Sequence, residues 1–222
     1  MRYEAVVPAV FVSRPNRFVA RVLVDGAEET VHVKNTGRCR ELLRPGAELW
    51  LAPAANPARK TKYDLIAVRK EDGVLFNLDS QAPNRVVGEW LQTQGFDRIW
   101  PEYPFGSSRI DFCLERGRER CLLEVKGCTL ERGGLGYFPD APTQRGARHL
   151  RELRAALEQG YLAAVAFVMQ AASIQRVLPN AETDPAFAAA LAEAERAGVR
   201  VLCLPCRVEP NLLEITAEAP PL

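Results

Sequence analysis

Residues 109–126 constrain the fold most, because apolar and polar residues alternate on both sides of a short turn at Gly117 and Arg118. If those two residues form the turn, Asp111 lies opposite Glu124 in an antiparallel hairpin. One face of the hairpin then carries only apolar side chains. These are Ile110, Phe112, Leu114, Cys121, Leu123 and Val125. A shift of one residue would destroy this segregation, so the sequence predicts the register as well as the hairpin.

The polar face of this hairpin predicts a divalent-cation site. Two facing carboxylates repel each other, and their approach raises the pKa of at least one of them unless a cation compensates. Mg²⁺ and Mn²⁺ prefer oxygen ligands, so Asp111 and Glu124 are the expected metal ligands. Lys126 projects from the same face as Glu124 and can stabilise charge that develops on a phosphate. Glu89, in a preceding helix, is a candidate third carboxylate.

A surface hairpin whose charges merely balance is the alternative interpretation, with Arg109 and Lys126 offsetting the two acids. Two features favour the metal site. Helices and strands are predicted after the hairpin, so its sheet should be covered and its carboxylates partly enclosed. Lys126 is also the only lysine after residue 70 in a chain that otherwise uses arginine, and an ammonium is a more compact charge than a guanidinium.

The first 80 residues are rich in short β-strands. Alternating β-branched residues between Asp-Gly and Pro-Gly turns predict five strands and one helical turn. The strands are expected at 17–24, 30–33, 48–51, 63–69 and 74–76, and the helical turn at 38–43. Such a series is typical of a small closed barrel of the OB type, although an SH3-like barrel fits the pattern equally.

This N-terminal half is mildly basic, with 13 lysines and arginines against 10 acidic residues. Arg59, Lys60 and Lys62 gather beside Tyr63 in an expected loop. Basic side chains next to an aromatic ring suit a nucleic-acid backbone with stacked bases. A solvated charged loop is the alternative interpretation.

After residue 80 the pattern changes to alternating helices and strands. Helices are expected at 84–91 with Asn84 as the N-cap, at 143–159 and at 185–197. Strands are expected at 99–105, 109–115, 120–126, 161–169 and 199–204. This order predicts an α/β sandwich around a mixed sheet, so the fold class is α/β in two domains, 1–80 and 81–222.

Three further segments invite functional interpretations. The helix at 143–159 carries Arg145, Arg148 and Arg151 at three-residue spacing beside His149, which could meet successive phosphates or form a solvated basic face. The glycine-rich stretch at 133–140 is expected to be a mobile loop over the site or a flexible linker. Cys203 and Cys206 end a buried strand and are expected to be structural, because no second cysteine pair completes a zinc site.

Composition limits the possible partners and compartments. The net charge of the 222 residues is +1, so a nucleic-acid site must come from local clustering. No apolar run approaches the roughly 18–20 residues of a membrane span, and the N-terminus lacks the features of a secretory signal. The six cysteines are then most simply reduced thiols of a cytoplasmic protein. The sequence does not indicate the oligomeric state.

Two resemblances rest on these residues. Asp111 and Glu124-Val125-Lys126, after a helix bearing Glu89, resemble the PD-(D/E)xK nuclease superfamily, although Ile110 stands where that pattern has proline. Wider motifs resemble the sugar fermentation stimulation protein family over nearly the whole chain. They lie at 32–38, 41–43, 45–46, 108–111, 124–126, 138–143, 145–146 and 149–150.

The family resemblance implies an OB-like N-terminal barrel, a restriction-endonuclease-like C-terminal α/β sandwich and non-specific DNA binding linked to sugar (maltose) metabolism. The strand type of the DNA stays open. The side chains expected at the nucleic acid are Arg38, Arg59, Lys60, Lys62, Arg109, Arg145, Arg148 and His149. Two functions are compatible with these features: cleavage of phosphodiesters with Mg²⁺ or Mn²⁺ at Asp111, Glu124 and Lys126, or regulatory DNA binding on a nuclease scaffold without turnover.

Overall fold

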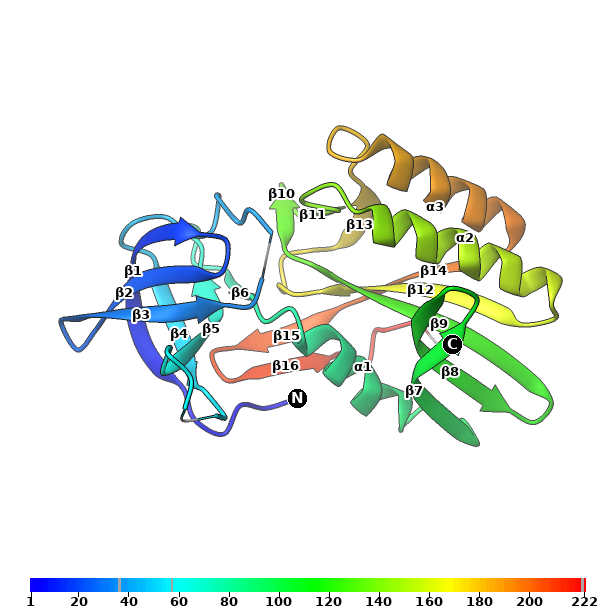
Figure 1. Ribbon diagram of the computed structural model, residues 1–222, viewed down its shortest axis with the longest axis horizontal. Coiled ribbons are helices and arrows are strands. Elements are labelled where there is room, and N and C mark those ends of the chain that lie inside the picture. Colours follow the sequence, from blue (N-terminus) through cyan, green and yellow to red (C-terminus); the bar gives the residue numbers. More distant parts are fainter. Residues whose placement is uncertain (36, 57, 221) are drawn as a thin grey trace.

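The computed structural model describes residues 1–35, 37–56, 58–220 and 222. Its chain forms a β-barrel beside an α/β sandwich, seen at the left and right of Figure 1. Residue 36, which belongs to the 32–38 motif, lies outside the described residues. No helix in the described ranges is long and apolar enough to cross a membrane.

Five strands close the barrel. They are β1 (Val7–Asn16), β2 (Val19–Val24), β3 (Ala27–Val33), β4 (Glu48–Pro53) and β5 (Tyr63–Arg69), with β6 (Leu75–Asn77) added beside β5. The sheet order is β3-β2-β1-β4-β5-β6, and a parallel pairing of β3 with β5 completes the closure. The sequence pattern missed β1, where Pro8 interrupts the apolar run yet pairs with Trp50 of β4. The chain at 38–43 makes one helical-type turn, in which the Leu43 N–H donates to the Cys39 carbonyl.

A mixed five-stranded sheet forms the centre of the sandwich. Its strands are β7 (Arg98–Phe105), β8 (Ser108–Arg116), β9 (Glu119–Cys128), β12 (Leu162–Met169) and β14 (Arg200–Leu204). The order is β14-β12-β9-β8-β7, parallel from β14 to β9 and antiparallel from β9 to β7. Helices α2 (Gln144–Glu158) and α3 (Pro185–Ala197) cover one face, and α1 (Ala82–Leu91) lies on the other (Figure 1).

Two small sheets complete the fold. One has the order β10-β11-β13, with β10 (Leu130–Arg132), β11 (Leu135–Phe138) and β13 (Arg176–Pro179), and the other joins β15 (Cys206–Glu209) to β16 (Leu212–Ile215). The prediction of a mobile loop at 133–140 is therefore wrong for Leu135–Phe138, which form β11. Gly133 and Gly134 adopt positive φ values and form the turn between β10 and β11, and both neighbours of β11 fix it by backbone hydrogen bonds.

Side chains cap the N-termini of two of the three described helices. The Thr143 side chain caps α2 by accepting from the Gly146 N–H at 3.0 Å, and Asp184 caps α3 in the same manner. Asn84 was expected to cap α1, and this expectation is wrong. The helix begins earlier, after Gln81, which makes no side-chain cap, so the Asn84 amide remains available for another contact.

A buried ionic cluster ties the barrel to the segment that enters α1. The Asp64 carboxylate in β5 accepts hydrogen bonds from His32 at 3.0 Å and Arg59 at 2.9 Å. The Lys34 ammonium lies 3.3 Å from Asp64 and 3.1 Å from Asp79, and both carboxylates are buried. Because a buried charge that loses its partner is costly, the cluster fixes β3, β5 and the 77–80 segment relative to one another.

We expect Asp64→Asn to destabilise the protein by about 1–3 kcal/mol at neutral pH, because it removes a buried charged acceptor. Burial raises the pKa of Asp64, but hydrogen bonds from Arg59 and His32 and the Lys34 charge outweigh it and hold the pKa below the ordinary value. A lowered folded-state pKa gives stability that is present above about pH 4, the ordinary value, and is lost as the pH falls through the folded-state pKa.

Urea unfolding at about pH 7 and about pH 3 tests this account. We expect the difference in the free energy of unfolding between wild type and Asp64→Asn to be smaller at the lower pH. Asp25→Asn, at an exposed turn position with positive φ that asparagine tolerates, is the control. A difference for Asp64→Asn that stays constant across this range would contradict the charge-based account.

Candidate metal and nucleic-acid site

The hairpin of β8 and β9 has the predicted register, but its ladder stops short of the site. The last paired positions are Phe112 and Leu123, so Asp111 does not pair directly with Glu124 as the pattern predicted. In the neighbouring β7–β8 ladder the pairing also skips Asp111 and Glu102, whose φ is 52°. This irregularity interrupts the strict alternation of side chains just where the carboxylates lie.

Asp111 is held by two donors. Its Oδ1 accepts from the Asn84 side chain of α1 at 2.7 Å, and its Oδ2 accepts from the Val125 backbone N–H at 2.7 Å. The carboxylate thus occupies the place of a missing strand-to-strand hydrogen bond. Ile110 was expected on the same face as Phe112, but it belongs to the other hydrophobic cluster, as the interrupted alternation requires.

Glu124 is the most enclosed acid of the site, with 1% of its surface exposed. Its Oε1 accepts from the Lys126 ammonium at 2.5 Å and from Nδ1 of His149 in α2. Its Oε2 is buried and has no hydrogen-bond partner among the described residues. A buried carboxylate oxygen without a partner is costly in an apolar interior, and it is therefore the natural position for an added cation.

His149 connects Glu124 to the protein surface. The Arg145 Nε–H donates to His149 Nε2 at 3.2 Å. Because that ring nitrogen must accept, the imidazole proton sits on Nδ1 and is donated to Glu124. Only 1% of His149 is exposed, whereas Arg145 reaches solvent one helical turn earlier.

The two carboxylates have opposite electrostatic environments. Burial, together with the nearby Glu124 charge, raises the pKa of Asp111. Burial would also raise the pKa of Glu124, but the hydrogen bond from His149 and the Lys126 charge lower it below its ordinary value. The repulsion predicted from the sequence therefore acts on Asp111, while Lys126 and His149 stabilise Glu124 as an anion.

Glu89 does not join the site. Its side chain is 58% exposed and pairs with the amino group of Met1 at 2.6 Å. The contact from α1 to the carboxylates comes instead from Asn84. Sequence reasoning assigned Asn84 to the helix end because asparagine is a common N-cap, and no local signal separates a cap from a residue that contacts a distant strand.

The predicted nucleic-acid residues of the sandwich come together. Arg109, Arg145, Arg148 and His149 line one open depression beside the carboxylates, which we call the basic depression. Glu102, Pro104, Gly106, Ser107 and Ser108 complete its lining, so three arginines stand against one acid. The three arginines are exposed. Two elements far apart in the sequence, the β7–β8 turn and the start of α2, thereby form a single basic surface.

The predicted residues of the barrel lie elsewhere and are partly occupied. Arg59 donates to Asp64, and Lys62 pairs with Glu29 at 2.7 Å. Lys60 and Arg38 are exposed. None of these four is among the described residues that line the basic depression.

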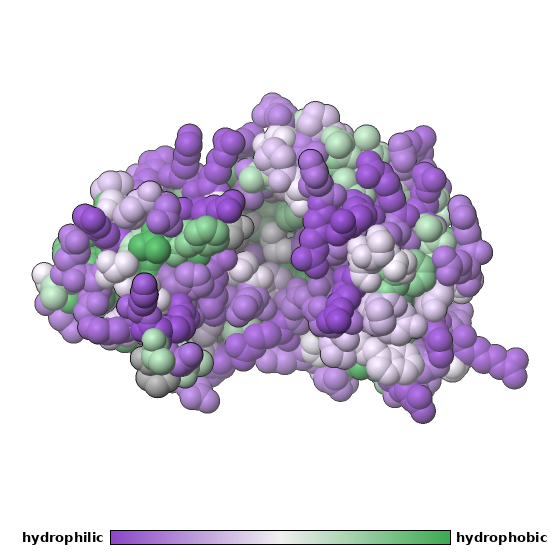
Figure 2. Space-filling view, in the orientation of Figure 1, coloured by the Kyte–Doolittle hydropathy of each residue, from purple (hydrophilic) through white to green (hydrophobic). Residues whose placement is uncertain are grey.

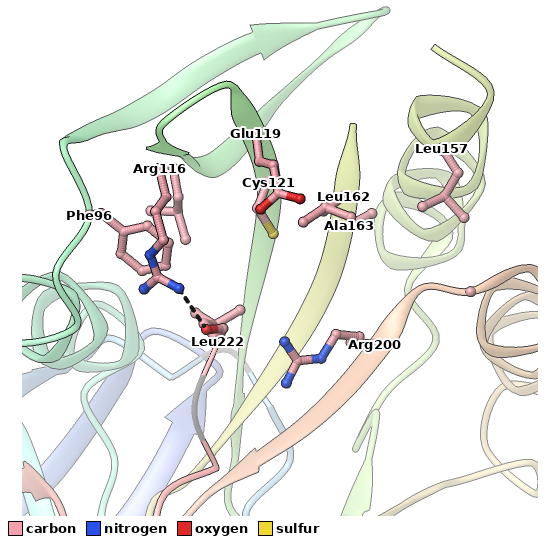
Figure 3. A pocket seen from close by; sticks show the side chains of 11 residues that line it. Phe96, Arg116, Glu119, Cys121, Leu157, Leu162, Ala163, Arg200 and Leu222 are labelled. Atoms are coloured by element: carbon pink, nitrogen blue, oxygen red, sulfur yellow. Dashed lines mark hydrogen bonds between the residues drawn. The ribbon is translucent and has the colours of Figure 1, made fainter. Parts of the chain in front are cut away.

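An apolar cavity of about 270 Å³ lies at the other end of the hairpin (Figure 3). Cys121, Leu162 and Ala163 form part of its wall, and the side chains of Arg116 and Arg200 reach it from two sides. The described residues that line it include none of the predicted site residues.

The donor set fits a hard divalent cation. The described residues contain no cluster of three or more His, Cys, Asp or Glu side chains arranged as metal ligands. Mg²⁺, however, is commonly held by one or two carboxylates, with waters and substrate phosphate completing its shell. Asp111 and the unpartnered oxygen of Glu124 supply that minimal set.

Comparison with known proteins identifies both parts of the fold. Residues 12–76 match the SfsA N-terminal OB domain, and residues 81–212 match the sugar fermentation stimulation protein RE domain. A sugar fermentation stimulation protein homolog of Desulfitobacterium hafniense is 50% identical over 217 residues, which cover 96% of this chain and 95% of that protein. One from Ruminiclostridium cellulolyticum is 43% identical over 219 residues, covering 97% and 96%.

The solved structure of Pyrococcus furiosus SfsA in complex with Ca²⁺ is also similar. It has a TM-score of 0.87 and 28% identity, and the match covers 100% of this chain and 97% of that one. The fold is therefore an OB-like barrel followed by a restriction-endonuclease-like sandwich. The chain belongs to the sugar fermentation stimulation protein family.

We expect Asp111→Asn and Glu124→Gln each to weaken Mn²⁺ binding by about 10-fold or more, since each removes one of only two anionic ligands. Isothermal titration calorimetry of Mn²⁺ into the full chain measures the change. Glu89→Gln is the matched control, because its carboxylate pairs with Met1 and should leave the affinity unchanged. Equal affinities in all four proteins would exclude this site.

His149 is expected to position Glu124. His149→Leu should weaken Mn²⁺ binding by roughly 10-fold, the usual cost of losing a partner that orients a metal ligand. His149→Gln, whose amide can still donate to Glu124, should recover part of that loss. If the leucine and glutamine variants bind Mn²⁺ equally, a positioning role for His149 is wrong.

Proposed function

We propose that this protein binds nucleic acid without sequence specificity and hydrolyses phosphodiester bonds with Mg²⁺ or Mn²⁺. The observation that carries the proposal is the buried Glu124 carboxylate, which has one oxygen bound to Lys126 and His149 and the other without a partner among the described residues. Burial and the nearby Glu124 charge both disfavour the ionised form of Asp111. A cation at the same site would stabilise that ionised form.

Asp111 and Glu124 would hold the ion, and the similar Pyrococcus furiosus SfsA was solved in complex with Ca²⁺. When bound, such a cation activates water and neutralises phosphate charge. Lys126 pairs with Oε1 of Glu124 at the edge of this site. Its ammonium would stabilise the negative charge that develops on the phosphate during cleavage.

The basic depression would hold the phosphate backbone. Arg109, Arg145 and Arg148 are exposed around His149, the residue that contacts Glu124. Guanidinium groups bind phosphate by paired hydrogen bonds, so the depression would deliver a phosphate to the carboxylates. Arg38, Lys60 and the barrel loop would extend this contact along single- or double-stranded DNA.

The proposed setting is the cytoplasm, where the six cysteines, all free in the structure, stay reduced. We place the boundary between the two functional parts near residue 80, between β6 and α1.

A second candidate is a DNA-binding regulator of sugar (maltose) metabolism that keeps the nuclease scaffold without turnover. One observation favours it: Glu89 is turned away, so the site has two carboxylates where a third was expected. The two candidates share the basic surface and differ only in chemistry.

Cleavage assays separate them. We expect the protein to cut single- or double-stranded DNA or RNA with Mg²⁺ or Mn²⁺ but not with chelator, and we expect Asp111→Asn and Lys126→Met to lose roughly 100-fold or more in rate. Glu89→Gln should cut like wild type. DNA binding by all variants without cleavage of any substrate would reject the enzyme and leave the regulator.

A further inference from the structure

A second hollow, distinct from the basic depression, lies between the barrel and the sandwich. Its volume is about 160 Å³, and Figure 2 shows the surface hollowed between the two bodies. We call it the inter-body cleft. The residues lining it are Asn35, Gly37, Ser80, Pro83, Gly127, Thr129, Leu130, Tyr137, Phe138, Asp140 and Gln170.

The cleft adjoins the carboxylates through the chain itself. Gly127 in its wall directly follows Lys126 on β9. Pro83 directly precedes Asn84, whose amide donates to Asp111. The cleft and the basic depression therefore reach the site from different sides, one through the end of β9 and the start of α1, the other through α2.

The walls of the cleft are unsuited to phosphate and suited to a neutral heteroaromatic ring. None of the described residues lining it is a lysine or arginine, and Asp140 adds a carboxylate. The other polar groups are amides and hydroxyls. Tyr137 is the aromatic residue of the wall whose ring carries a guanidinium contact, with Arg132 Cζ 5.2 Å from the ring centroid. Unpaired bases are recognised by this combination of aromatic stacking and hydrogen bonds to the base edge.

The shape of the cleft depends on two glycines. A Cβ on Gly127 would collide with Oε1 of Gln170 and lie 2.7 Å from Pro83, and a Cβ on Gly37 would collide with the Asp140 carboxylate. Gly127 is not among the glycines with a positive φ, so close approach, not backbone conformation, requires a glycine there. At Gly37 and Gly127 the walls of the cleft approach so closely that a larger residue would push them apart.

Gln170 is buried, with 2% of its surface exposed, and hydrogen bonds from its amide nitrogen fix its orientation. Its amide nitrogen donates to Oδ1 of Asn77 at 2.9 Å and to the Asp79 carbonyl at 3.3 Å. The amide oxygen is therefore the end directed at Gly127 and the cleft. On the barrel side, Asn35 accepts from the Gly37 N–H at 2.8 Å through its own oxygen, which orients its NH₂ group as a donor.

We infer that the inter-body cleft is a subsite for one unpaired nucleobase, next to a phosphate bound by the arginines of the basic depression. The inference rests on the proposed function and makes it more specific. A base already paired and stacked in a duplex must be extruded to enter, which costs free energy. The preferred substrate is accordingly a single strand or an unpaired end, with Tyr137 stacking on the base and Asn35 and Gln170 contacting its edge.

Equilibrium binding tests this subsite without requiring cleavage. Fluorescence anisotropy in chelator compares a labelled DNA hexamer with its duplex, and an abasic nucleotide replaces each position of the hexamer in turn. We expect tighter binding of the single strand and a loss of about 10-fold when the abasic nucleotide occupies the position that fills the cleft, as is typical of one stacked base.

Tyr137→Leu should weaken binding of the intact hexamer by a similar factor and abolish the penalty of the abasic nucleotide at that position. Ser80→Trp, an exposed position that narrows the cleft, should act likewise. Tyr161→Leu is the control, because Tyr161 packs against Phe105 and is not among the described residues that line the cleft. It should change neither the affinity for the intact hexamer nor the abasic penalty.

Two results would overturn the inference: equal affinity for single strand and duplex, or an abasic penalty that persists undiminished in Tyr137→Leu. Failure of the proposed cleavage is recognised separately, because the Mg²⁺ and Mn²⁺ assays report it while these binding measurements remain interpretable.

Discussion

The candidate site is organised around the buried carboxylate of Glu124. Two elements meet there: β9 supplies both Glu124 and Lys126, and α2 supplies His149. Removing a carboxylate from water is costly unless it is paired and hydrogen-bonded. One oxygen meets that condition, whereas the other remains without a partner among the described residues. The fold therefore encloses an anionic oxygen whose surroundings suit a cation.

The two surfaces on either side of Glu124 differ in charge and residue type. Towards α2, the imidazole of His149 leads to the arginines of the basic depression, which suit phosphates. Towards α1, the end of β9 opens into a cleft lined by amides, hydroxyls and one carboxylate, without lysine or arginine among the described lining residues. Phosphate and base are the two chemically distinct parts of a nucleotide. The arrangement of unlike surfaces on either side of one strand end agrees with a nucleic acid that passes across it.

Local patterns predicted the register of the β8–β9 hairpin, but not the point at which its strand pairing ends. Alternation and turn chemistry determined the register up to Phe112 and Leu123, because a one-residue slip would expose the apolar face. They could not predict that pairing stops there, since the irregularity depends on Glu102 in a third strand. The same limit affected α1: Asn84 and Glu89 lie on one helix, but only packing of the helix against β8 and β9 decides which of them faces Asp111.

The sequence by itself determined the order of the helices and central-sheet strands of the sandwich, most strands of the barrel and the family, because periodicity, turns and motifs are local properties of the chain. It also identified Asp111, Glu124 and Lys126 as one group. It missed the short strands of the two small sheets, β10-β11-β13 and β15-β16. Only the tertiary structure decided that His149 donates to Glu124, that Glu89 is excluded, and that the inter-body cleft forms where Gly37 and Gly127 meet other segments. These contacts join residues far apart in the chain, so their geometry depends on how helices and strands pack, which no local pattern encodes.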